Sequence, residues 1–405
     1  MSLLQQLSDK TVWEEYLSYK ASLLGKHREL QELQSFCDRQ EYLPICRQIA
    51  EGTKFPLPQK SVLSKQGSDK KRTVYTYPYA WNQVLRLLTH LMLRRYDGLF
   101  CRGLYSFRPG RSAKDAVRSL LRLDGLEEMY CYKADIHDYF NSIPMDQFLP
   151  LLDRALQDDP ELLIFLRGLL EEPAVMDRGK AVKERKGIMA GTPQACFYAN
   201  LYLHGLDLHF HQAGVPYMRY SDDIILFAPT REEMESRAGE VRAFLSERGL
   251  EINPKKESFS APGEGWTFLG FRCEGETVDI AAATVTKLKH KMRRKARALQ
   301  RWANRKGLEG EKAAKAFIRV FNRKLLESPE DNELSWSFWF FSVINTDRSL
   351  REIDRYAQDC IRYLISGKRN KARYNVRYED MKRLGYQSLV HAYYNYPPKP
   401  EKQNE

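Results

Sequence analysis

A pair of acidic residues lies between two strand-like segments of the chain. Residues 215–220 (VPYMRY) and 224–228 (IILFA) are rich in β-branched and aromatic side chains, and only Ser221, Asp222 and Asp223 separate them. A short polar connection between two such runs predicts a β-hairpin with the acids at its tip. Neighbouring carboxylates repel one another unless solvent or a cation compensates their charge. The tip is therefore either a structural Asp-Asp turn or part of a cation site.

A third aspartate follows another strand-like segment. In residues 128–143 (EMYCYKADIHDYFNSI) a β-prone run ends at Asp135 and passes into a turn or short helix. If this strand joined the hairpin in one sheet, Asp135 would lie beside Asp222 and Asp223. Three carboxylates at strand ends form a hard-oxygen site that suits two Mg²⁺ ions about 4 Å apart, as in phosphoryl-transfer enzymes. In that chemistry one ion activates an attacking hydroxyl and the other neutralises a leaving pyrophosphate.

Positive charge is concentrated in one segment. The whole chain has a formal net charge of +12, and residues 284–324 carry fifteen Lys or Arg against two Glu. Apolar residues recur there every three or four positions, which predicts a helix with one apolar face. They are Leu288, Met292, Ala296, Leu299 and Ala303. A second helix, with Phe317, Val320, Phe321 and Leu325 on its face, is expected after a break at residues 307–310. The bases form either a solvated helix surface or, at this density, a surface that follows a phosphate backbone.

The other segments read as helices and short hairpins. Residues 1–60 have a helical pattern, with Thr11 and Glu14 as a capping pair. The polar, basic residues 64–72 and the β-rich run 73–77 predict a hairpin that carries Lys70, Lys71 and Arg72. Residues 80–97 are expected to form a helix, and residues 265–272 another hairpin.

Residues 104–112 (LYSFRPGRS) are predicted to form a loop that opens a further helix. Ser112 and Asp115 have the spacing of a helix-capping pair. Arg108 and Arg111 would then lie beside a helix N-terminus, a position that suits anions.

Composition and cysteine spacing exclude several classes of protein. A chain of 405 residues can form two or three sub-domains with a core that needs no covalent staples. Its seven cysteines are scattered without a Cys-x-x-Cys pair, so neither a disulfide framework nor a structural zinc is expected. No run approaches the roughly 18 apolar residues of a membrane span, and the first ten residues lack a signal-peptide pattern. We therefore expect a cytoplasmic protein with no membrane partner.

Several motifs together resemble those of reverse transcriptases, and of the bacterial group II-intron-like branch in particular. Tyr220-Ser221-Asp222-Asp223 resembles the Y-x-D-D signature, and residues 135–140 resemble the first palm motif. Residues 106–111 (SFRPGR) are similar to the fingers block, and residues 268–271 (FLGF) to the primer grip. The matches follow the family's order over about 200 residues. The resemblance implies an α+β, right-hand polymerase fold with four parts: a helical extension (1–62), catalytic fingers and palm (63–279), a basic helical thumb (280–328) and a helical C-terminal region (329–405).

The resemblance also implies roles for individual residues. Asp135 and Asp222 would be the principal ligands of two Mg²⁺ ions, with Mn²⁺ as a substitute, and Asp223 and the Ile136 carbonyl would complete the site. Phe140 corresponds to a steric gate, since an aromatic ring under the sugar leaves room for hydrogen and not for a 2′-hydroxyl; the alternative is a core phenylalanine. The remaining residues implied in the dNTP pocket are Lys71, Arg72, Arg108 and Gly191. Lys256 matches the lysine that protonates pyrophosphate, and Lys255 is the alternative.

One motif departs from the group II pattern. In residues 187–200 (GIMAGTPQACFYAN), Met189 and Ala190 replace the usual Pro-Gln, while Gly191, Pro193 and Asn200 are kept. Gln194 is thus not the familiar pocket glutamine, and we expect fidelity or template preference to differ.

The closing residues 336–396 resemble the tails of the defence-associated or "unknown group" branch. About eighty residues follow the basic helices without a Cys/His cluster, so intron splicing and target cleavage are not expected. The branch implies an RNA-directed DNA polymerase that copies a dedicated, structured noncoding RNA, encoded nearby, into cDNA from dNTPs during anti-phage defence. The oligomeric state stays open. Alternatives are a retron-like or intron-derived enzyme without a defence role, and a non-catalytic RNA-binding protein with a polymerase shell.

Aromatic residues in the closing stretch leave two further questions open. Trp336, Trp339, Phe340 and Phe341 either stack on bases or pack against the thumb. Tyr393, Tyr394 and Tyr396 either supply a priming hydroxyl, as in some relatives, or are structural.

Overall fold

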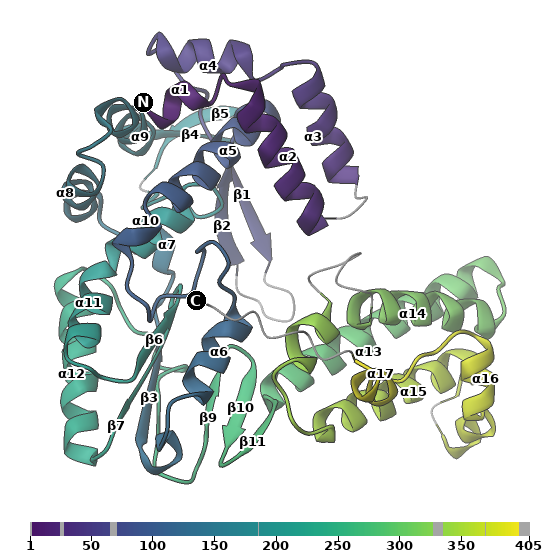
Figure 1. Cartoon of the computed structure of the whole chain (residues 1–405). Coiled ribbons are helices and arrows are strands. Elements are labelled where there is room, and N and C mark those ends of the chain that lie inside the picture. The colour runs from purple at the N-terminus through teal and green to yellow at the C-terminus, as the bar shows by residue number, and fades with distance from the viewer. Residues whose placement is uncertain are drawn as a thin grey trace. The chain divides into compact units, whose positions relative to one another are not determined.

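The computed structural model describes residues 2–24, 28–64, 71–184, 186–326, 335–368 and 370–396. They form two compact units, one within residues 1–22 and 26–264 and the other within residues 23–25 and 265–405. Both helices and sheets are present (Figure 1), so the predicted α+β class is confirmed. Among the residues described, no helix is long and apolar enough to cross a membrane.

The first unit begins with four helices that pack around buried aromatic rings. They are α1 (Leu3–Gln6), α2 (Lys10–Leu24), α3 (Arg28–Asp38) and α4 (Leu43–Ala50). Trp13 is buried, stacks on Tyr42 at 4.8 Å and meets Phe36 edge-on. The predicted helical character is confirmed, but the predicted cap is wrong. Helix α2 begins one residue before Thr11, whose N–H donates to the Asp9 side chain at 2.8 Å.

One sheet of this unit has the strand order β2-β1-β4-β5. Its strands are β1 (Gln59–Ser64), β2 (Lys71–Thr76), β4 (Ala174–Asp177) and β5 (Lys180–Lys183). The β1–β2 pair is antiparallel and confirms the predicted basic hairpin, whereas β4 joins β1 in parallel. Residues 65–70 at the tip of the hairpin, including Lys70, lie outside the described residues.

The other sheet of this unit has the order β6-β7-β3-β8 and is antiparallel throughout. Its strands are β3 (Tyr130–Asp135), β6 (Tyr217–Tyr220), β7 (Asp223–Ala228) and β8 (Ser258–Ser260). The predicted hairpin is the β6–β7 pair, and β3 lies beside it as expected. Helix α12 (Arg231–Glu247) packs on β3 and β7, while α11 (His204–Gln212) and α6 (Ala113–Leu121) pack on β6. Strands β3 and β7 are therefore largely buried.

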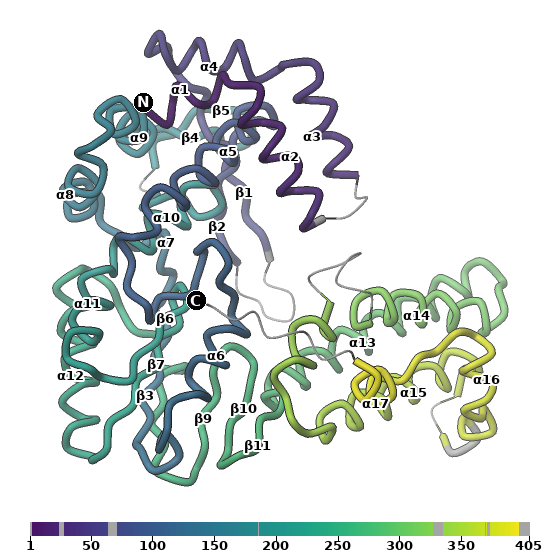
Figure 2. Tube along the Cα trace, viewed as in Figure 1, coloured from purple at the N-terminus to yellow at the C-terminus, as the bar shows by residue number. Residues whose placement is uncertain are grey.

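The chain passes between the two sheets more than once, as the trace shows (Figure 2). The connecting helices are α5 (Tyr79–Arg95), α7 (Tyr139–Ser142), α8 (Met145–Ala155), α9 (Pro160–Glu171) and α10 (Ala195–Tyr202), with short 3₁₀ turns at Asp97–Leu99 and Leu126–Glu128. After β3 the chain returns through α7, α8 and α9 to the β4–β5 hairpin, and then through α10 and α11 to β6 (Figure 2). Both sheets therefore belong to one compact unit.

The second unit combines a three-stranded sheet with helices. Its strands are β9 (Trp266–Phe268), β10 (Phe271–Glu274) and β11 (Thr277–Ile280), in the order β11-β10-β9. Helices α13 (Ala282–Lys306), α14 (Gly310–Leu325) and α15 (Arg348–Ser366) pack against one another. Shorter elements are a π-helical turn (Ser337–Phe341), a 3₁₀ turn (Lys371–Asn375), α16 (Tyr378–Arg383) and α17 (Leu389–Tyr394). Gly307 ends α13 with a φ of 61°, so the predicted break is confirmed.

The aromatic residues of the closing stretch pack within this second unit. Phe340 and Phe341 are buried, and Phe341 meets the rings of Tyr393 and Tyr396 edge-on. The Tyr393 hydroxyl donates to the Ile344 carbonyl at 2.9 Å, while Tyr394 is 68% exposed. These contacts favour packing over base stacking for the two phenylalanines.

Candidate functional site

The structure brings the three predicted aspartates together at one end of the β6-β7-β3-β8 sheet. Asp135 ends β3 and is the cross-strand neighbour of Asp223, the first residue of β7. Asp222 precedes Asp223, and its carbonyl accepts a hydrogen bond from the Ile136 N–H at 3.1 Å. Asp135 is buried, and Asp222 and Asp223 are half-buried. The ends of two paired strands thus hold three carboxylates close together. In the sequence, the Asp222–Asp223 pair begins 87 positions after Asp135.

The turn between β6 and β7 has an unusual backbone conformation. Tyr220 pairs with Asp223, so Ser221 and Asp222 alone connect the strands. Ser221 has a φ of 61°, in the left-handed region that costs a residue with a Cβ roughly 1–2 kcal/mol. Such a conformation persists only where its surroundings hold it.

Burial and mutual repulsion raise the pKa values of the Asp222 and Asp223 carboxyls. Burial raises the pKa of Asp223 to about 6, with Lys133 opposing the shift and Asp222 and Asp135 adding to it. Burial, followed by repulsion from Asp135, also raises the pKa of Asp222. The folded chain therefore holds these two groups in a setting that disfavours their charged forms, which a cation would relieve.

Lys256 lies within this acidic cluster. Its ammonium group contacts the Asp135 carboxylate, and Asn253 approaches the other oxygen at 3.4 Å. Burial lowers the pKa of Lys256, but the hydrogen bond to Asp135 and the negative charges of Asp135, Asp223 and Asp222 together outweigh it, so the net shift is upward. Lys255 is exposed, and its described contact is a backbone N–H to Asn253. Of the two lysines that the sequence left open, Lys256 is the residue at the carboxylates.

The donor chemistry of the cluster suits a divalent cation, although its present arrangement does not. The Asp135, Asp222 and Asp223 carboxylates and the Ile136 carbonyl are hard oxygen donors of the kind that Mg²⁺ prefers. Within the described ranges, however, no three His, Cys, Asp or Glu side chains are arranged to hold a metal ion. Lys256 contacts the Asp135 carboxylate, so a cation bound there would compete with its ammonium group.

Phe140 lies on the short helix α7 that follows β3, close to the carboxylates in sequence. Its ring is half-buried and meets that of Phe107 edge-on at 6.4 Å, so it is not an enclosed core residue. The Ile188 N–H donates to the Phe140 carbonyl at 3.0 Å. A Cβ at Gly187 would come within 2.5 Å of that carbonyl, so only glycine allows this approach.

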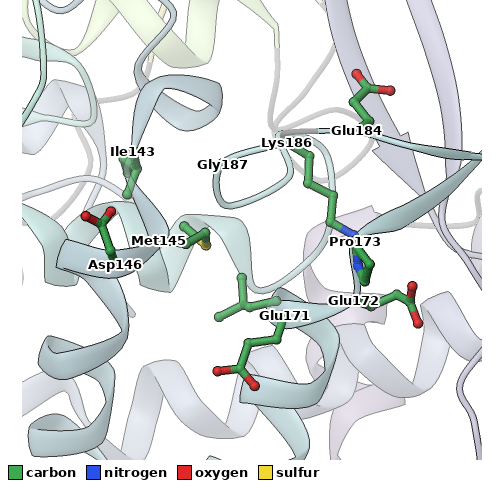
Figure 3. A pocket seen from close by; sticks show the side chains of 10 residues that line it. Ile143, Met145, Asp146, Glu171, Glu172, Pro173, Glu184, Lys186 and Gly187 are labelled. Carbon is green, nitrogen blue, oxygen red and sulfur yellow. The ribbon is translucent and has the colours of Figure 1, made fainter.

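A pocket of about 290 Å³ lies beside Gly187 (Figure 3). Its lining includes Lys186 and several acidic side chains but none of the predicted site residues, all of which the structure describes. The lining residues are Ile143, Met145, Asp146, Leu170, Glu171, Glu172, Pro173, Glu184, Lys186 and Gly187. The pocket is therefore separate from the carboxylate site.

The predicted dNTP-pocket residues are only partly assembled. Gly191 has a φ of 102°, and a Cβ there would lie 3.0 Å from the Tyr75 carbonyl, so this segment packs closely on β2. Lys71 and Arg72 begin the same strand and are exposed. Gln194 is buried and donates to the Leu85 carbonyl at 3.3 Å, which agrees with its exclusion from the pocket.

Arg108 is not directed toward solvent. Its guanidinium donates to Asp97 at 2.7 and 2.8 Å and to the carbonyls of Cys101 and Leu104. Arg111 donates to the carbonyls of Arg102 and Leu104. These contacts hold the loop before α6, whose predicted Ser112 cap is confirmed by a bond from the Asp115 N–H. A contact between Arg108 and a nucleotide stays a prediction that this geometry does not favour.

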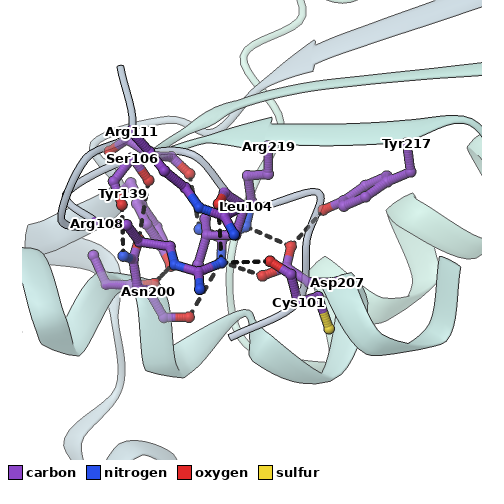
Figure 4. Close-up of polar contacts among 12 residues, drawn as sticks. Cys101, Leu104, Ser106, Arg108, Arg111, Tyr139, Asn200, Asp207, Tyr217 and Arg219 are labelled. Carbon is purple, nitrogen blue, oxygen red and sulfur yellow. Dashed lines mark hydrogen bonds and ion pairs between the residues drawn. The ribbon is translucent and has the colours of Figure 1, made fainter. Parts of the chain in front are cut away.

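A buried polar network lies behind the β6–β7 turn (Figure 4). Arg219 on β6 and Asp207 on α11 form a salt bridge in which both side chains are fully buried. The Tyr217 hydroxyl donates to Asp207 at 2.8 Å. Ser106 and Asn200 bond reciprocally, at 3.0 and 2.8 Å. This network was not predicted, because no spacing in the sequence links its members.

Lys133 is a second residue that the sequence analysis missed. It lies two positions before Asp135 on β3, and its positive charge lowers the pKa of Asp223. Side chains two apart on a strand share a face of the sheet. That alternation is the signal that could have identified it.

Among the comparisons with known proteins, the family match agrees with the motifs. The family model "Reverse transcriptase (RNA-dependent DNA polymerase)" matches residues 63–273. An uncharacterized 91 kDa protein in the cob intron of Schizosaccharomyces pombe is 29% identical over 156 residues, which are 37% of this chain and 18% of that protein. Apo telomerase from Candida tropicalis matches with a TM-score of 0.47 and 10% identity, over 76% of this chain and 58% of that one. A C-terminally truncated form of it gives 0.44 and 12%, over 55% of each chain.

Proposed function

Because this chain belongs to the reverse transcriptase family, we propose that it is an RNA-directed DNA polymerase of right-hand type that copies a dedicated noncoding RNA into cDNA in bacterial defence against phage. The RNA template is proposed to be structured and encoded beside the gene, and the branch is proposed to be the defence-associated one within the group II-like enzymes. Support for the branch comes from the resemblance of residues 336–396 to the tails of that group. The proposal includes the four-part division of the chain given above and a cytoplasmic location.

We assign the catalytic site to the acidic cluster, and the cross-strand pair of Asp135 and Asp223 is the observation that carries this assignment. Asp135, Asp222, Asp223 and the Ile136 carbonyl would hold two Mg²⁺ ions, for which Mn²⁺ can substitute. When bound, the ions supply charge neutralisation for the primer hydroxyl and for the pyrophosphate that leaves. Buried carboxylates that repel one another are a costly arrangement unless a cation binds them.

The proposed roles of the chain's own residues follow from their positions. Phe140, half-buried on α7, would lie under the sugar and exclude a 2′-hydroxyl. Lys71 and Arg72 would hold the triphosphate from β2, against which Gly191 packs. Lys256 would leave Asp135 when the cations bind and would be free to protonate the pyrophosphate.

The second unit offers the proposed surface for the nucleic acid. Lys287, Lys291, Arg294, Arg301 and Arg305 are exposed on α13. Their spacing of three, four or seven residues places them on one face of that helix. A row of cations with this spacing can follow successive phosphates and release their counterions.

The test is to express the gene with its flanking DNA, isolate the protein and sequence the RNA and DNA bound to it. The matched variant replaces Asp222 and Asp223 with alanine. DNA complementary to one flanking RNA, present only with the intact aspartates, is the expected result.

A defence role further requires that the intact gene reduce phage plating and that the variant lose this effect. Bound RNA without aspartate-dependent DNA would contradict the proposal and favour an RNA-binding shell. Aspartate-dependent cDNA without phage protection would favour a retron-like or intron-derived role.

A further inference from the structure

The backbone turn at Ser221 determines where the Asp222 and Asp223 carboxylates point. Ser221 has its φ of 61° immediately before the two acids, and it is only 7% exposed. Its carbonyl accepts a hydrogen bond from Nη1 of Arg219 at 3.2 Å. The guanidinium thus contacts the peptide unit that joins Ser221 to Asp222, so any movement of it would be passed directly to the first carboxylate.

Hydrogen bonds from both its side chain and its backbone hold Arg219 in place (Figure 4). Its Nε and Nη2 donate to the Asp207 carboxylate at 2.7 and 2.5 Å, and Nη2 also donates to the Asn200 carbonyl at 3.1 Å. Its backbone N–H donates to the Gly103 carbonyl at 2.9 Å, and its carbonyl accepts from the Tyr105 N–H at 3.1 Å. A planar guanidinium can make these contacts at once, whereas a lysine ammonium cannot.

A fully buried ion pair carries a large desolvation cost. Apolar residues of similar volume often stabilise a fold as well or better, so a buried pair is weak evidence of a role in stability alone. Burial lowers the pKa of Arg219, but the charge and hydrogen bonds of Asp207, together with smaller effects of Tyr139 and Tyr217, raise it above its ordinary value, so the guanidinium remains charged. The pair is placed where its hydrogen bonds reach the turn that carries the acids.

The same network reaches the helix that bears the proposed steric gate. Asn200, whose carbonyl accepts from Arg219, follows Ala199 on α10. The Ala199 carbonyl accepts from the Tyr139 hydroxyl at 2.5 Å, and Tyr139 is the neighbour of Phe140. One buried network therefore contacts both the backbone of the acidic turn and the helix of Phe140.

We propose that Arg219, together with Asp207, is a positioning residue that sets the Ser221 turn so that Asp222 and Asp223 can bind divalent cations. This inference rests on the proposed assignment of the catalytic site. Arg219 does not touch the reacting atoms and acts through the Ser221 carbonyl. Its loss should therefore weaken cation binding and slow the chemical step more than it weakens binding of the dNTP.

The main test compares Arg219→Lys with the parent chain in single-nucleotide addition on a primed RNA template. The variant keeps a positive charge opposite Asp207 but loses the planar set of donors. We expect kcat to fall about 100-fold, as for a misplacement of about 1 Å. KM for the dNTP should change by less than about threefold. Binding of Mn²⁺ alone, followed by electron paramagnetic resonance without substrate, should weaken about tenfold.

A matched control and a rescue separate positioning from general destabilisation. The control is Asp159, a residue of the same unit that is 2% exposed and whose carboxylate accepts a hydrogen bond from the Leu3 N–H at 2.8 Å. Asp159→Ala should therefore lower thermal stability without changing the Mn²⁺ affinity of the folded protein. Adding Ser221→Gly to Arg219→Lys should restore part of kcat, because glycine adopts a positive φ without cost. If Arg219→Lys behaves as Asp159→Ala does, with unchanged Mn²⁺ affinity, the inference is overturned.

Three further outcomes are decisive. If Arg219→Lys does not fold, Asp207→Asn carries the test, since it keeps the shape of the carboxylate and removes its charge. Unchanged Mn²⁺ affinity and kcat in that variant would then overturn the inference. Retained activity after replacement of Asp222 and Asp223 by alanine would refute the proposed catalytic site itself. Loss of activity there, with full activity in Arg219→Lys, would refute only the positioning role.

Discussion

Replacing Asp223 with asparagine should make the metal-free protein more stable. Burial raises the pKa of the Asp223 carboxyl from 3.8 to about 6. The folded chain thus binds this proton more tightly than the unfolded chain does. The carboxyl therefore favours the folded state below about pH 4, and that contribution is lost as the pH rises through about 6. At pH 8 the Asp223 carboxyl is ionised in both states, and burial of its charge then destabilises the folded state by the full amount.

The size of the effect follows from the same two pKa values. The difference between 3.8 and about 6 corresponds to about 3 kcal/mol at pH 8. Asparagine has the same shape without the charge but remains a polar group to be buried. We therefore expect Asp223→Asn to raise the free energy of unfolding by about 2 kcal/mol, or the midpoint temperature by about 4–8 °C. Polymerase activity should be lost in the same variant.

The assay is denaturant and thermal unfolding in EDTA at pH 4 and pH 8. The gain should be present at pH 8 and nearly absent at pH 4, where folded Asp223 is protonated. Asp124→Asn, at an exposed carboxylate, is the control and should change stability at neither pH. An Asp223→Asn protein that is no more stable than the parent at pH 8, or equally stabilised at both pH values, would refute the reasoning.

Three further predictions concern the gate, the tail and the basic helix. Phe140→Ala should raise the ratio of ribonucleotide to deoxyribonucleotide addition about 10- to 100-fold, because a missing ring leaves room for the 2′-hydroxyl; an unchanged ratio in single-nucleotide assays would show that the ring is not the gate. Asp354 is buried and accepts hydrogen bonds from Tyr386, Ser388, Leu389 and Val390. Asp354→Ala should therefore lower stability by about 3 kcal/mol and expose this segment to protease, and equal denaturation midpoints would contradict the role of these bonds. Replacing Lys291 and Arg294 with glutamine should reduce the slope of log affinity for single-stranded RNA against log salt by about 1.4, and a slope equal to the parent's would place the RNA elsewhere.

The sequence predicted those parts of the site that local pattern determines. Runs rich in β-branched and aromatic residues on each side of a short polar turn predicted the β6–β7 hairpin, and the β-prone run before Asp135 predicted β3. Antiparallel pairing of these strands then brings the carboxylates together at one end of the sheet. The basic helix and its end at Gly307 were equally predictable, because a 3.6-residue period and a glycine with positive φ are local signals.

The remaining features depend on contacts between distant segments. Asp207 and Arg219 are joined because a helix packs on a strand, and no spacing in the sequence indicates this. Arg108 was expected near an anion, but a carboxylate of the chain itself, Asp97, takes up its guanidinium. The hairpin of β4 and β5 was also missed, since its strands have only four residues each and are rich in charge.

The strand order β6-β7-β3-β8 has a consequence for the newly made chain. Strand β3 lies in the interior of its sheet, yet both of its neighbours are encoded after it. Roughly ninety residues separate Asp135 from the end of β7, and at about 5–20 residues per second the ribosome needs about 5–20 s to make them. Throughout that interval β3 has two unpaired edges, which are templates for aggregation. The carboxylates also stay apart until β7 emerges, so an unfinished chain that stops before β7 lacks the proposed catalytic centre.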